Sequence, residues 1–241
     1  MGRIHRSRHS GPDQFGHGVR RNLCRDTVCA RRGPVPQPGG RNLVEVNADQ
    51  ASNQNLSMTQ RSTGALVEAS TSANAGNAWD MSSRAAAVGN QALLHNQGGA
   101  MVIQGSQSNS AQVRSTAINT AYDYGAVEAY AQASGNQLYA GNQDIWIQID
   151  NAQFNQGGVQ ATATFSGHNG YDVYVGADAV GNAVTGYGCA SCGATMTSTN
   201  NQTNNGAVSS VVNSSVTGSA RAVITGSNAT GNSATFYVSG N

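Results

Sequence analysis

Hydrophobic and polar residues alternate along several short stretches of the chain. The clearest stretch is Asp144–Asp150, in which three isoleucines share one face. Val159–Phe165 and Tyr171–Val175 alternate in the same way. A period of two residues predicts half-buried β-strands. Gly-Asn, Asn-Gly and Gly-Gly pairs interrupt these stretches and supply residues suited to tight turns.

Two short motifs recur with one period. The dipeptide Gly-Asn recurs at spacings of 46, 46 and 50 residues, and Gln-x-Asn recurs in step at spacings of 46 and 49. Two independent markers with one period indicate an internal repeat. We interpret them as repeat turn markers: Gly89, Asn90, Gly135, Asn136, Gly181, Asn182, Gly231 and Asn232 for the first motif, and Gln107, Asn109, Gln153, Asn155, Gln202 and Asn204 for the second.

Alignment on the markers predicts which strand residues lie in register. Val127, Val173 and Val223 fall at one position of the unit. A hydrophobic position of the preceding strand is likewise filled by Met101, Ile147 and Met196.

Short strands in a fixed repeat predict an all-β, repetitive β-solenoid. We expect four strands a unit, arranged as two strand–turn–strand coils of about 20 and about 26 residues. Stacked coils bury a thin core that small residues fill, while Asn, Gln and Ser form ladders from coil to coil. The alternative is an antiparallel β-sandwich built from the same strands.

The predicted β-repeat domain covers residues 43–241. Its units lie near residues 43–88, where the pattern is degenerate, and at 89–134, 135–180 and 181–230, with a partial unit at 231–241. Gly76-Asn77 looks like an imperfect marker of the first unit. The partial unit leaves an exposed strand edge, which predicts self-association.

Composition divides the chain near residue 42. Residues 1–41 hold nine of the 13 Arg and all four Pro, and carry a charge of about +7, against −6 for the remainder. An acidic, lysine-free remainder argues against nucleic-acid binding. The 25 Asn and 18 Gln of the chain are typical of repetitive β-structure or low complexity. No apolar run is long enough to predict a transmembrane segment.

Residues 1–42 form a basic segment without hydrophobic periodicity. Three interpretations stay open: a basic arm that binds anionic surfaces, a disordered tail, or sequence translated from a misplaced start or a wrong frame. The segment lacks the apolar stretch of a signal peptide, so export is not evident from this sequence.

The candidate chemistry of the chain is sparse. Cys189 and Cys192 form a CxxC motif in the lengthened unit, where we expect a protruding loop closed by a local disulfide; free thiols and a metal or redox role are the alternatives. His95 and His168 are isolated, and the carboxylates do not form a recognisable set. We therefore predict no catalytic residues, no metal site and no cofactor.

Aromatic residues cluster between positions 122 and 187. Aromatic faces can stack on sugar rings, although strand aromatics are more often packing residues. Trp146 has the opposite parity to Ile147 and should point outward. We name Trp146 and Tyr174 as possible ligand-facing aromatics.

The unit length, both markers and the segment GYGCASCGATMTSTNNQTNNGAV at Gly186–Val208 resemble the holdfast attachment protein D type of stalked bacteria, with the repeat character of curlin-type surface amyloids. The resemblance covers roughly Leu43–Asn241. It implies a non-enzymatic, outer-membrane-associated protein of the cell surface, which anchors an adhesive polysaccharide in a biofilm together with other surface anchor proteins. The alternatives are a polysaccharide-active β-helix enzyme and a structural protein like a phage tail fibre.

Overall fold

A computed structural model describes residues 39–238 except 145 and 190–193. The chain is all-β over these residues, and all pairings between its strands are parallel. Residues 1–38 of the predicted basic segment lie outside the described part of the chain. β1 begins at Gly39. The strands are β1 Gly39–Ala48, β2 Gln54–Ser62, β3 Leu66–Asn96, β4 Ala100–Asn109, β5 Gln112–Asn142, β6 Trp146–Asn155, β7 Val159–Gly188, β8 Thr195–Asn204, β9 Val208–Val216 and β10 Ala222–Val238.

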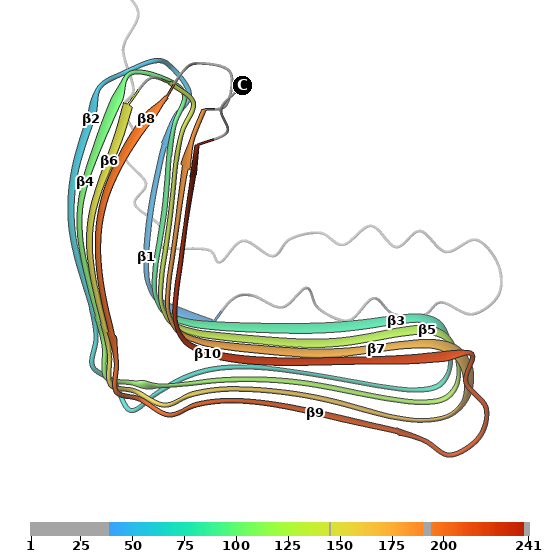
Figure 1. Ribbon diagram of the computed structural model, residues 1–241. Helices are drawn as coiled ribbons and strands as arrows, with labels where there is room; N and C mark the ends of the chain where they lie inside the picture. Colours follow the sequence, from blue (N-terminus) through green and yellow to red (C-terminus); the bar gives the residue numbers. More distant parts are fainter. Residues whose placement is uncertain (1–38, 145, 190–193, 239–241) are drawn as a thin grey trace, which may run out of the picture.

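The strands wind into a solenoid with an L-shaped cross-section (Figure 1). β2, β4, β6 and β8 stack as one sheet on the outer side of the upright arm. β1, β3, β5, β7 and β10 form the second sheet, which β9 joins beside β7. The long strands β3, β5 and β7 run out along the lower layer of the horizontal arm, turn back at its tip, return along the upper layer and then rise into the upright arm (Figure 1). We call the bend between the two arms the elbow.

Each arm has its own hydrophobic core. The horizontal arm packs alternate residues of the long strands, and β5 supplies its residues from Val113 to Ala133. The upright arm packs Leu138 and Ala140 of the same strand against Ile103 of β4 and Ile147 of β6. The two cores are therefore two separate clusters that share one continuous chain.

The repeat makes one coil of 46 residues, which corrects the expected division into two stacked coils. β3 pairs with β5, β4 with β6, and β5 with β7, each time between residues 46 apart. The two predicted strand–turn–strand segments correspond to the two arms of a single coil. Each arm packs its strands around a thin core of its own, so in the sequence pattern one arm looks like a complete coil. The chain passes through both arms before it returns to its starting register.

Parallel pairing confirms the solenoid and shows that the alternative antiparallel sandwich is wrong. The predicted registers are also confirmed, since Val173 pairs with Val127 and Val223, and Ile147 pairs with Met101 and Met196. The spacing grows to 49 residues from β6 to β8 and to 50 from β7 to β10. The extra residues lie mainly between β7 and β8, where the sequence places the CxxC motif.

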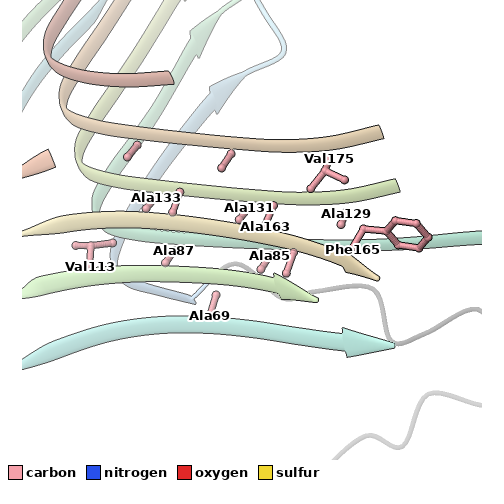
Figure 2. Close-up of a cluster of buried hydrophobic side chains, with 14 of the residues drawn as sticks. Ala69, Ala85, Ala87, Val113, Ala129, Ala131, Ala133, Ala163, Phe165 and Val175 are labelled. Atoms are coloured by element: carbon pink, nitrogen blue, oxygen red, sulfur yellow. The ribbon is translucent and has the colours of Figure 1, made fainter. Parts of the chain in front are cut away.

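Small side chains fill the horizontal core (Figure 2). Ala87, Ala129, Ala131 and Ala163 are fully buried, and Phe165 is the largest fully buried side chain of this cluster. Two facing layers of strands leave little space between them, which is why Ala and Val replace Leu and Phe here. Within the described residues, no helix has the length and apolar character that crossing a membrane requires.

Candidate functional site

The elbow brings together the Asn residues of the Gly-Asn motif. They form a ladder in which each Asn Nδ2 donates to the Asn Oδ1 of the following coil, over 2.6–2.8 Å, through Asn42, Asn90, Asn136, Asn182 and Asn232. Each of the first four also donates to a backbone carbonyl of the facing strand, such as Phe154 O for Asn136, 3.0 Å away. The ladder thus fastens coil to coil and one face of the solenoid to the other.

The Gln-x-Asn motif forms two further ladders on the opposite side of the elbow. Gln107 donates to Gln60, Gln153 to Gln107 and Gln202 to Gln153, over 2.6–2.7 Å. The Asn ladder runs the other way, from Asn109 to Asn155 and on to Asn204. These side chains are buried or half-buried, so a polar seam occupies the elbow.

Glycine is required where the two motifs meet. A Cβ at Gly135 would lie 2.5 Å from Asn155 Oδ1 and 2.5 Å from the carbonyl oxygen of Gly181. Gly89 and Gly181 stand in the equivalent place in the neighbouring coils. The glycine of the Gly-Asn motif therefore allows neighbouring coils to approach each other closely.

The first coil contains elbow residues that the spacing of the markers did not reveal. Asn42 pairs with Asn90, and Gln60 and Ser62 pair with Gln107 and Asn109. Gly76-Asn77, which resembles a marker, lies elsewhere, since Asn77 pairs with Asp123. The sequence does carry a marker of this coil, Gln60-Arg61-Ser62, in which Ser takes the place of the Asn of Gln-x-Asn. Ser62 Oγ and Asn109 Oδ1 are both buried without a hydrogen-bond partner, so the ladder is incomplete there.

The predicted disulfide lies partly outside the described residues. Cys189 is buried and disulfide-bonded. Cys192 falls in the undescribed segment 190–193, so a bond between Cys189 and Cys192 stays a prediction.

The two aromatics predicted to face a ligand, Trp146 and Tyr174, stand on different strands, β6 and β7. Trp146 begins β6 and is half-buried, beside the fully buried Ile147, so it points outward as its parity indicates. Tyr174 is 40% exposed on β7 and stacks on Tyr130, with 6.5 Å between the ring centroids. Burial, together with a hydrogen bond to the Asp178 carboxylate, raises the pKa of the Tyr130 hydroxyl.

A groove of about 530 Å³ is lined by the residues at which β3, β5 and β7 turn back in the horizontal arm. Trp79 and Tyr171 contribute its aromatic surface, and Asn77, Asp123 and Asn169 its polar surface. Arg221 lies over the Tyr171 ring, 5.7 Å from the centroid, and forms an ion pair with Asp172, which lowers the pKa of that carboxyl group. This groove brings together residues that the sequence separates by whole coils.

The described residues hold no candidate metal centre. No group of three His, Cys, Asp or Glu side chains among them is arranged to hold a metal ion. His95 lies beside Asn47, whereas His168 stacks on Tyr122 with 4.6 Å between the ring centroids.

Residues 39–158 match a family model described as Holdfast attachment protein D. No curated protein and no solved structure matches the chain significantly. The matched span runs from the start of β1 to the last residue before β7, and it includes Asn42, Asn90 and Asn136 of the elbow ladder. The resemblance found in the sequence is confirmed: over residues 39–158, the chain belongs to the holdfast attachment protein D family.

Proposed function

We propose that this protein is a non-enzymatic adhesion protein of the bacterial cell surface, which anchors the adhesive polysaccharide of a holdfast to the outer envelope and associates with copies of itself and with other surface anchor proteins. The observation that carries the proposal is the family match over residues 39–158. The polar ladders support it, because hydrogen-bonded stacking gives a rigid scaffold suited to bearing load.

The proposed anchoring is tested by deleting the gene in the bacterium that encodes the protein. We expect the deletion strain to synthesise the adhesive polysaccharide but to release it into the medium, and we expect the full-length gene to restore attachment. Polysaccharide retained on the deletion strain would contradict the proposal. Polysaccharide shortened by the purified protein would instead support the alternative of an enzyme.

Self-association is supported by the last coil of the described stack. Val223 of β10 occupies the inward-facing position of Val173, yet it is 45% exposed, whereas Val173 is 2% exposed. Gln202 likewise accepts no hydrogen bond from a further coil within the described residues, although Gln153 and Gln107 do from theirs. Unpaired strand edges with exposed core positions favour the addition of strands from a second copy.

A charge at this inward-facing position should block assembly. We expect Val223→Lys to raise the concentration needed for assembly by about tenfold, because an inward-pointing charge opposes edge-to-edge pairing. Sedimentation velocity and thioflavin fluorescence measure assembly. Ile224→Lys is the matched control, since Ile224 is the next residue, points outward and is 60% exposed. Equal assembly of both variants would count against this interface.

A further inference from the structure

The groove in the horizontal arm is built by three consecutive coils. Asn77, Asp123 and Asn169 occupy one register position of β3, β5 and β7. Three residues further along the same strands, Asp80, Ala126 and Asp172 are also in register. The residues directly before them therefore share one position of the coil, and these are Trp79, Gly125 and Tyr171. A polar row and an aromatic row therefore run side by side across the coils, each at the strand spacing of about 4.8 Å.

Gly125 creates the hollow between the aromatic rings. A Cβ there would lie 3.0 Å from the Trp79 indole and would clash with the Trp79 carbonyl. The Trp79 ring can consequently lean across the middle coil towards Tyr171, with 6.0 Å between the centroids and an edge-to-face angle of 67°. The two rings remain open to solvent, at 72% exposed for Trp79 and 51% for Tyr171.

Two of the three polar side chains of the groove are unused, whereas Asn169 Oδ1 accepts hydrogen bonds from the Ser219 amide and hydroxyl. Within the described part of the chain, the side chains of Asn77 and Asp123 make no hydrogen bond or ion pair. Tyr124, which lines the groove, is 4% exposed and its hydroxyl has no hydrogen-bond partner. The Tyr124 ring packs edge-to-face on Phe165 with 5.1 Å between the centroids, so this residue joins the groove to the horizontal core.

These features select the chemistry of the ligand. Flat aromatic faces bind apolar sugar-ring faces, while an amide and a carboxylate exchange hydrogen bonds with ring hydroxyl groups. The volume lies within the range of small-molecule sites. Arg221 is already paired with Asp172, and the unpaired Asp123 would repel an anionic ligand. The ligand should therefore be a neutral sugar.

We infer that the groove binds a segment of a neutral hexose polysaccharide, with Trp79 and Tyr171 stacking on sugar rings and Asn77 and Asp123 contacting hydroxyl groups. The inference rests on the proposed function, which it deepens by naming the ligand class and the binding face.

The two tryptophans of the chain allow a direct binding measurement. In the full chain carrying Trp146→Phe, Trp79 is the sole fluorophore of its kind. Titration with cellohexaose, chitohexaose and mannohexaose should change the Trp79 emission saturably for at least one sugar, and hexagalacturonate should bind at least about tenfold more weakly than that sugar. No saturable change with any neutral sugar, or tighter binding of the anionic one, would overturn the inference.

Tyr171 and Tyr237 provide a matched pair of variants, because both are exposed tyrosines, at 51% and 46%, and only Tyr171 lines the groove. Tyr171→Ala should weaken binding by about tenfold and Tyr237→Ala by less than about twofold, with unchanged thermal unfolding. Equal losses would overturn the inference. In cells, a Tyr171→Ala strain should release polysaccharide as the deletion strain does. If the Tyr171→Ala strain retains the polysaccharide and the deletion strain releases it, sugar binding in the groove is refuted and the proposed function stays intact.

Discussion

Replacing Asn136 with alanine is expected to lower the free energy of unfolding by about 3–5 kcal/mol. Asn136 is fully buried at the elbow, where it accepts from Asn90 and donates to Asn182 and to Phe154 O. The substitution leaves one donor and two acceptors without partners in a site that is closed to water. Each such group costs about 1–3 kcal/mol, and the total is less than the sum where the elbow relaxes.

Urea unfolding of the full chain, followed by circular dichroism, measures this loss. Asn74→Ala is the matched control, because Asn74 lies exposed on β3 and its side chain makes no hydrogen bond within the described residues. We expect the control to change stability by less than about 0.5 kcal/mol. If the two variants unfold at the same urea concentration, the ladder does not stabilise the elbow.

Replacing Gly135 with alanine is expected to destabilise the protein by about 2–3 kcal/mol, although only one methyl group is added. That methyl group would lie 2.5 Å from a side-chain oxygen and 2.5 Å from a backbone carbonyl of the next coil. The carbonyl cannot retreat without separating two stacked coils, so the ladders on both sides of Gly135 would be strained.

Gly76→Ala separates this effect from the general consequences of replacing glycine. A Cβ at Gly76 meets no atom within 4 Å. Because alanine restricts the unfolded chain, we expect Gly76→Ala to be neutral or to stabilise the protein by up to about 1 kcal/mol. Thermal unfolding of both variants gives the comparison. A stable Gly135→Ala variant would show that the coils approach less closely at the elbow than described.

The sequence predicted the solenoid and the ladder residues because these depend on a fixed period. An Asn that must meet an Asn of the next coil cannot shift by one residue, so Asn90, Asn136 and Asn182 remain countable along the chain. The first coil escaped this count because Ser62 replaces Asn and the spacing there is 47 or 48 residues. The alternation of hydrophobic residues over Asp144–Asp150 predicted that Ile147 and Ile149 share one buried face, and both are fully buried.

The arrangement of the arms and the groove could not be predicted in the same way. Both a short coil and one arm of a longer coil produce a strand–turn–strand pattern, and only the pairing distinguishes them. Trp79 and Tyr171 lie two coils apart, and their proximity depends on Gly125 between them. None of these residues belongs to a motif, so alignment by the markers does not single them out.

The central claim is that each repeat forms one coil whose residues return to register after 46 positions. Spin labels at Asn74→Cys and Thr120→Cys test it directly, since these exposed residues pair across β3 and β5. With Cys24 and Cys29 replaced by serine, electron paramagnetic resonance of the doubly labelled chain should show strong dipolar broadening. Labels at Asn74→Cys and Gln97→Cys, about half a repeat apart in sequence, should show none. Broadening in the second pair without broadening in the first would contradict the single coil.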